Sequence, residues 1–112
     1  MDVLDSITEI NNHSLSIKEK EEILEQIYSE IDSIDDSLVE LLNYRAEKYE
    51  LSSLLKKQLG IPNYSPKREK EILKRVEHSN INNLSSIEVK QIFERIIDVS
   101  RAMQKRIRDK SK

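Results

Sequence analysis

The sequence predicts an all-α protein whose chain forms three helices, the first of them very long. Apolar residues between Ser16 and Leu59 recur at spacings of three and four, which places them on one side of a helix. The 112 residues include one Gly and two Pro, so the chain has few places for sharp turns. The Ser-x-x-Glu sequences at residues 16–19 and 85–88 and the Ser-Pro pair at residues 65–66 then supply start signals for three helices.

The first helix is predicted to run from about Ser16 to Leu59, with Ser16 and Glu19 as a capping box and Gly60 and Pro62 as its end. Six apolar residues form a seam along it: Leu24, Ile27, Ile31, Ile34, Leu38 and Leu41. At ~1.5 Å per residue this helix measures roughly 65 Å, whereas a compact domain of this size is about 30 to 35 Å across. One chain is too small to bury the seam, so we expect a second copy to cover it.

The composition bounds the possible functions. With 37% hydrophobic and 36% charged residues, a monomer would have a thin core. The formal net charge of -2 argues against general nucleic-acid binding. The absence of cysteine is compatible with a reducing compartment, and no run of about 18 apolar residues or basic-then-apolar leader occurs. We therefore expect a cytoplasmic protein with no membrane segment and no metal.

The two ends of the chain differ in character. Residues 1–20 are weakly patterned and are interpreted as an N-terminal extension, in which Val3, Leu4, Ile7 and Ile10 share a face and predict a short helix. Residues 21–112 are interpreted as the helical domain. The last dozen residues carry six cations: Arg101, Lys105, Arg106, Arg108, Lys110 and Lys112. We interpret this tail as a solvated helix end whose charges complement the helix dipole, with an anionic partner as the alternative.

Two shorter helices follow the connection at Gly60. Ser65 and Pro66 open the second helix, which ends near His78 and buries Ile72, Leu73 and Val76. A capping box that begins at Ser85 opens the third. Its inward stripe is mostly apolar: Val89, Ile92, Phe93, Ile96, Ile97, Ser100, Met103, Gln104 and Ile107.

Polar residues interrupt these apolar faces. On the first helix the seam continues into a polar set at spacings of four, three and four: Arg45, Tyr49, Ser52 and Lys56. Because a buried unpaired charge is costly, the cations either extend to solvent at the end of the helix or face a pocket that receives an anion. Together with Ser100 and Gln104, they suggest a polar pocket for a small anionic ligand.

This order of residues resembles the all-helical (type II) chorismate mutases. The family signature contains Ile-Asp-x-Ile-Asp, Leu-Leu-x-x-Arg, a Lys eleven residues on, Pro-x-Tyr-Asp-Pro-x-Arg-Glu and Ser-x-x-x-Gln. The matching segments here are residues 31–35, residues 41–45, Lys56, residues 62–69 and residues 100–104. The resemblance extends over roughly residues 27–107 and leaves the first 20 or so outside.

The resemblance implies an intertwined homodimer with paired first helices and two equivalent active sites. It also implies an isomerase that converts chorismate to prephenate in the shikimate pathway toward phenylalanine and tyrosine. The reaction is an intramolecular rearrangement that needs no nucleophile, metal or cofactor. Such an enzyme holds the substrate in its folded shape and stabilises charge on the breaking ether oxygen.

Carried over by position, the resemblance assigns the catalytic roles to Arg45, Lys56 and Gln104. Arg45 would grip a substrate carboxylate, and Lys56 and Gln104 would donate hydrogen bonds to the ether oxygen. Glu69 would accept from the substrate hydroxyl. The full predicted substrate-binding set is Arg45, Ser52, Ser65, Arg68, Glu69, Ser100 and, from the partner chain, Tyr28.

Two of these positions depart from the family pattern. The family has an Arg in place of Tyr28, and residues 1–44 contain no Arg at all. Loss of one charge-assisted contact costs about 2–4 kcal/mol, or roughly 30- to 1,000-fold in rate. Ser65 stands where the family often has Asp, and it keeps the helix-capping role.

Three other functions remain open from the sequence. The first alternative is a binding or regulatory relative with impaired catalysis. The second is an isochorismate pyruvate lyase, and the third is a plain helical dimerisation module. Tyr28→Arg tests the first, because a competent pocket would gain rate. Product analysis with chorismate and with isochorismate separates the second alternative from a chorismate mutase. The third predicts that Arg45→Ala leaves ligand binding unchanged.

Overall fold

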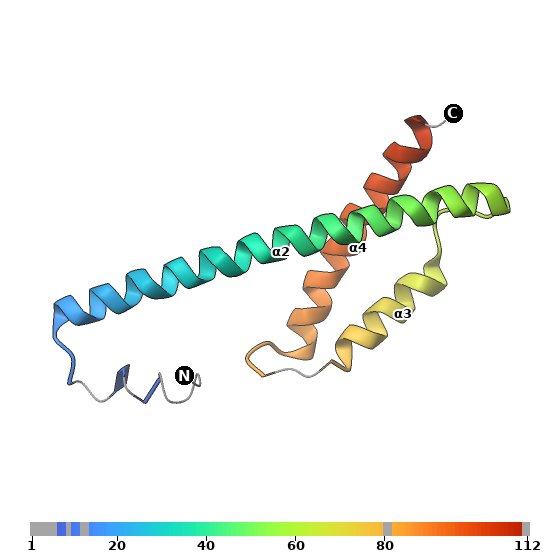
Figure 1. Ribbon diagram of the computed structural model, residues 1–112. Helices are drawn as coiled ribbons and strands as arrows, with labels where there is room; N and C mark the ends of the chain where they lie inside the picture. Colours follow the sequence, from blue (N-terminus) through green and yellow to red (C-terminus); the bar gives the residue numbers. More distant parts are fainter. Residues whose placement is uncertain (1–6, 9, 12–13, 80–81, 111–112) are drawn as a thin grey trace. The chain divides into compact units, whose positions relative to one another are not determined.

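The computed structural model describes residues 7–8, 10–11, 14–79 and 82–110 (Figure 1). Within the described residues from 14 onward, three α-helices follow one another: α2 (Ile17–Leu59), α3 (Pro66–Glu77) and α4 (Ser86–Lys110). No strand occurs among the described residues, so the predicted all-α class is confirmed. The short helix predicted within residues 3–10 falls largely outside the described residues. The boundary predicted at residue 20 stays a prediction.

All three helices begin at the predicted serine caps. The Ser16 and Ser85 hydroxyls accept from the backbone N–H groups of Glu19 and Glu88, each at 3.1 Å. The carboxylate of Glu88 in turn accepts from the Ser85 backbone N–H at 2.8 Å, and this hydrogen bond lowers the pKa of Glu88. Ser65 caps α3, with Pro66 at its first position. These caps satisfy N–H groups that have no partner within the helix.

The end of α2 is fixed by Gly60, as the sequence predicts. Gly60 has a φ of 71°, in the left-handed region that favours glycine. Its N–H donates to the Lys57 carbonyl at 3.2 Å, and the Ile61 N–H donates to the Lys56 carbonyl at 3.0 Å. This pair of bonds is the Schellman pattern, which satisfies the last carbonyls of the helix. It also sets the direction in which the chain leaves the end of α2.

We predict that Gly60→Ala destabilises the fold by about 1 kcal/mol, because an L side chain strains a left-handed backbone. A Cβ at this position would meet no atom within 4 Å, so the cost comes from the backbone and not from a clash. Gly60→Asn is the matched control, since Asn tolerates this conformation better than Ala. Urea unfolding measures both variants, and equal stability of Gly60→Ala and the parent protein would contradict the prediction.

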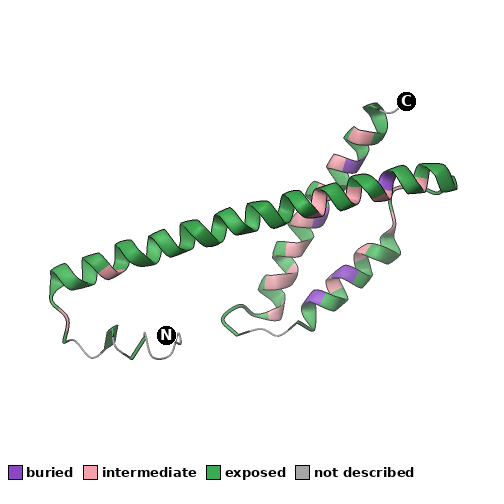
Figure 2. Cartoon of the chain, in the orientation of Figure 1, coloured by how far each residue is buried: buried purple, intermediate pink, exposed green. Residues whose placement is uncertain are grey.

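The chain divides into two compact units, Met1–Leu42 and Asn43–Lys112, with the division inside α2. In the second unit α3 packs against α4. Three apolar side chains are buried among the described residues: Ile72 and Val76 of α3 and Ile97 of α4. The buried residues of Figure 2 lie on α3, α4 and the last turns of α2. The thin core expected from the composition is confirmed.

In the first unit the apolar seam of α2 is exposed. The six seam side chains keep between 37% and 64% of their accessible surface. A continuous apolar stripe of this length is unusual on the surface of a single chain and marks an interaction surface. No helix in the described part of the chain is both long and apolar enough to cross a membrane.

Candidate active site

The second unit contains a small, partly enclosed cavity where the end of α2, the start of α3 and the middle of α4 meet. Six residues of the predicted site line it: Lys56, Ser65, Arg68, Glu69, Ser100 and Gln104. Five further residues complete its wall: Tyr49, Asn63, Tyr64, Ile97 and Arg101. The wall is rich in cations and hydrogen-bonding groups, which suits a small anionic ligand.

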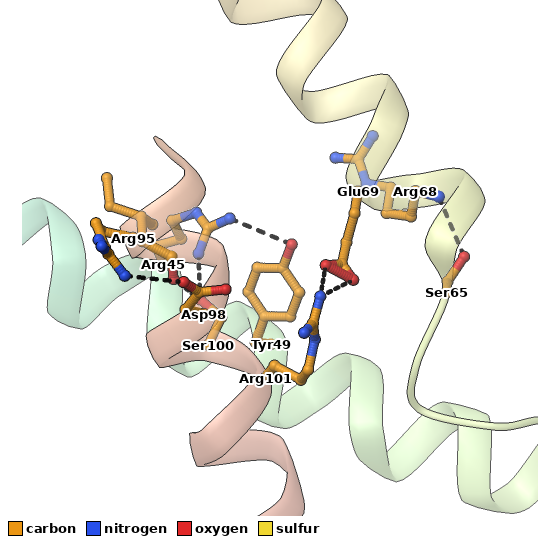
Figure 3. A network of polar contacts seen from close by, with 10 residues as sticks. Arg45, Tyr49, Ser65, Arg68, Glu69, Arg95, Asp98, Ser100 and Arg101 are labelled. Atoms are coloured by element: carbon orange, nitrogen blue, oxygen red, sulfur yellow. Dashed lines mark hydrogen bonds and ion pairs between the residues drawn. The ribbon is translucent and has the colours of Figure 1, made fainter. Parts of the chain in front are cut away.

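Arg45 is joined to this cavity through two of its wall residues. Its guanidinium donates to the Ser100 hydroxyl at 2.5 Å and to the Tyr49 hydroxyl at 3.3 Å (Figure 3). It also lies over the Tyr49 ring, 4.6 Å from Cζ to the ring centre. The Ser100 hydroxyl donates to the Ile96 carbonyl at 2.9 Å. Arg45 is thus half-buried and held by contacts from two helices, not extended into solvent.

Lys56 is also half-buried and lies on the cavity wall. Its ammonium donates to the Asn63 backbone carbonyl at 2.8 Å, across the turn that follows Gly60. An ammonium has three donors, so one bond to a carbonyl leaves two for a ligand. Of the two arrangements left open by the sequence, the one with cations facing a pocket is therefore correct for Lys56.

Glu69 forms an ion pair across the site with Arg101. Its carboxylate accepts from Arg101 Nη2 through both oxygens, Oε1 and Oε2, the latter at 2.9 Å. The Glu69 side chain keeps only 20% of its exposure, and the Arg101 side chain keeps 51%. The hydrogen bond to Glu69 raises the pKa of Arg101 above its ordinary value. The pair connects the first turn of α3 to α4 along one side of the cavity (Figure 3).

Gln104 and Arg68 line the cavity in different ways. Gln104 lies one helical turn after Ser100 on α4 and is buried, with 8% of its surface exposed. The Arg68 backbone N–H donates to the Ser65 hydroxyl at 3.2 Å, which is the α3 cap. The Arg68 guanidinium pairs with Glu71 at 3.5 Å in an exposed contact. Exposed ion pairs of this kind contribute little to stability, so Arg68 remains available to a ligand.

The structure thus brings together most, but not all, of the predicted set. Ser52 does not line the cavity. Its hydroxyl donates to the Tyr49 carbonyl at 2.8 Å and faces an adjoining hollow that shares Lys56 with the cavity. Tyr28 belongs to the first unit, where 53% of its surface is exposed. Its predicted contribution to a partner's site stays a prediction.

The sequence over residues 27–105 matches the family model described as chorismate mutase type II. The chain belongs to this family. It is 34% identical over 89 residues to a chorismate mutase of Methanocaldococcus jannaschii, covering 75% of this chain and 86% of that protein.

Two solved structures of chorismate mutases are similar in fold. The enzyme from Helicobacter pylori, crystallised with prephenate, has a TM-score of 0.72 at 32% identity and covers 79% of this chain and 96% of its own. The form II structure from Thermus thermophilus has a TM-score of 0.71 at 25% identity, and the match covers 74% of this chain and 94% of the Thermus chain. The resemblance stated from the sequence motifs is therefore confirmed.

Within this chorismate mutase fold, sequence reasoning misplaced Arg101. The sequence pattern places it among the solvated cations of the C-terminal tail, whereas its side chain reaches Glu69 and lines the cavity. The available signal was its spacing of three residues before Gln104, which puts both on one side of α4. Asn63 was also missed. Its side-chain Oδ1 is buried without a hydrogen-bond partner in the described structure and offers an acceptor at the cavity.

Proposed function

We propose that this protein converts chorismate to prephenate in the cavity between α2, α3 and α4. The observation that carries the proposal is the convergence of Lys56, Gln104 and the Arg45–Ser100 pair on one small cavity in a chain of this family. An intramolecular rearrangement requires shape and charge and no acid–base pair. A wall of cations, an amide and hydroxyls supplies both.

In this proposal Lys56 and Gln104 act on the breaking ether bond. The Lys56 ammonium and the Gln104 amide N–H₂ donate hydrogen bonds to the ether oxygen as negative charge develops on it. Both groups lie on the wall of the same cavity, one from α2 and one from α4. Donors that are fixed before the reaction stabilise this charge without reorganisation, which is the largest catalytic effect available to such a site.

Arg45 and Glu69 hold the substrate in its folded shape. The Arg45 guanidinium binds a substrate carboxylate next to Ser100, and a planar fork suits this bidentate contact. Glu69 accepts a hydrogen bond from the substrate hydroxyl, and Arg68 and Ser65 surround the bound molecule from the α3 side. Ser52 approaches it from α2, through the adjoining hollow. Restricting the substrate to its reactive conformation removes much of the entropy barrier.

We further propose that the active form is a homodimer in which the seams of two α2 helices pack together. The exposure of all six seam residues supports this arrangement. Tyr28 of the partner chain would then reach the site and offer a hydroxyl where the family has an Arg. A cytoplasmic location also stays a prediction, and the lack of cysteine in the sequence is compatible with it.

Tyr28→Arg is expected to raise kcat/KM for chorismate by tens-fold or more, because a guanidinium adds a charge-assisted contact to a substrate carboxylate. Steady-state kinetics of the parent and the variant measure the change. Tyr44→Arg is the matched control, since Tyr44 is an exposed tyrosine of α2 that does not line the cavity. An unchanged rate in Tyr28→Arg would show that position 28 does not reach the substrate.

The proposed reaction is tested by supplying chorismate and isochorismate in separate assays and identifying the products. We expect prephenate from chorismate and no release of pyruvate from isochorismate. Pyruvate from isochorismate without prephenate from chorismate would assign the chain to the lyase reaction. Binding of prephenate without turnover of either compound would leave it a binding protein.

A further inference from the structure

Arg101 occupies a position that the proposed chemistry does not use. It lies on α4 between Ile97 and Gln104, two buried residues of the cavity wall. Its guanidinium contacts two other parts of the second unit: Glu69 in the first turn of α3, and Tyr64 in the connection before α3. Arg101 Cζ lies 4.9 Å from the centre of the Tyr64 ring.

The geometry of the Arg101–Glu69 contact leaves the carboxylate free to act. A single nitrogen, Nη2, lies against both carboxylate oxygens. A carboxylate offers about four lone-pair directions, so this contact leaves others open for a donor in the cavity. The Glu69 side chain is only 20% exposed, and both of its oxygens lie against Arg101. The Tyr64 ring gives the guanidinium a second contact that holds it in place.

We propose that Arg101 is a positioning residue of the active site, which aims the Glu69 carboxylate into the cavity so that it meets the substrate hydroxyl. This inference rests on the proposed function, because it assigns Arg101 a role through Glu69. Arg101 itself does not touch the reacting atoms. The contact also joins α3 to α4 at the cavity.

The test is a double-mutant cycle in steady-state kinetics with chorismate. Arg101→Gln lowers kcat/KM by about 10- to 100-fold, with most of the change in KM, because a misaligned Glu69 loses a contact present throughout the reaction. In a Glu69→Ala background the same substitution changes kcat/KM by less than about twofold, since the residue through which it acts is gone. Arg101→Lys keeps the charge but not the planar fork, and it restores part of the activity.

The matched control is Arg95→Gln on the same helix. Arg95 also pairs with a carboxylate, Asp98 at 3.6 Å, but its side chain is 86% exposed and lies outside the cavity wall. We expect its kinetics to equal those of the parent. Circular dichroism and sedimentation check that each variant is folded. If Arg101→Gln does not fold, Arg101→Lys takes its place in the double-mutant cycle.

The outcomes separate this inference from the proposed function. Equal losses from Arg101→Gln in the parent and in Glu69→Ala would overturn it, because Arg101 would then act directly on the substrate. Parent-like kinetics of Arg101→Gln would overturn it alone and leave the mutase function intact. A parent protein that neither turns over chorismate nor binds prephenate would overturn the proposed function, and this inference with it.

Discussion

Lys56→Ala is expected to lower kcat for chorismate by roughly 10²–10³-fold, because in the proposed mechanism it removes a fixed positive charge beside the ether oxygen on which negative charge develops. The interaction strengthens in the transition state, so kcat and kcat/KM should fall by similar factors. Lys56→Gln keeps a hydrogen-bond donor without the charge, so its kcat should lie between those of the parent and Lys56→Ala. Steady-state rates of prephenate formation measure all three proteins.

Lys57→Ala is the matched control for this substitution. Lys57 is the next residue of α2, is exposed and does not line the cavity. Because Lys56 also donates to the Asn63 carbonyl, thermal unfolding of Lys56→Ala separates a catalytic loss from a structural one. A folded Lys56→Ala protein with a rate within about threefold of the parent would remove Lys56 from the mechanism, since removal of one such donor normally costs far more.

Ile31→Glu is expected to dissociate the proposed homodimer and abolish activity with it. Ile31 lies in the middle of the seam and keeps 44% of its surface in the single chain. In a symmetric interface one substitution introduces two carboxylates, and an unpaired buried charge costs several kcal/mol. The dissociation constant should therefore rise roughly 10³-fold or more. Sedimentation at micromolar concentration should give twice the chain mass of 13.2 kDa for the parent and the single mass for the variant.

Ser29→Glu provides the control for charge and helix content. Ser29 is exposed and lies two residues before Ile31, on the side of α2 that faces away from the seam. It should remain a dimer with parent-like activity. A parent protein that sediments as a compact monomer would contradict the account of the seam, whatever the behaviour of Ile31→Glu.

The helix boundaries were predictable because each depends on a few neighbouring residues. Ser16, Ser65 and Ser85 act on N–H groups three residues away, and Gly60 is the one glycine of the chain. The cavity was predictable in part because polar residues on otherwise apolar faces need partners. Arg45 and Ser100 are 55 residues apart in sequence, yet each is a polar residue on an otherwise apolar helix face, and the two are in contact.

Other features depend on information that a single helix pattern does not contain. The sequence does not predict the role of Arg101, because the helix dipole and solvent already account for cations in the C-terminal part of a helix. The contact with Glu69 arises only from the packing of α3 against α4. Asn63 lies in a turn, where periodicity gives no orientation. The way in which the α2 seam is covered depends on two chains. The sequence therefore predicts that the seam is covered, but it does not predict the geometry of the packing.

The most direct test of the account is the loss of chorismate absorbance on addition of the purified protein, with prephenate identified as the product. The account predicts turnover within a few orders of magnitude of ~10 per second, a typical enzyme value, with Tyr28 tolerated at its position. Chorismate consumption no faster than in buffer, by a protein that is folded and dimeric, would contradict it.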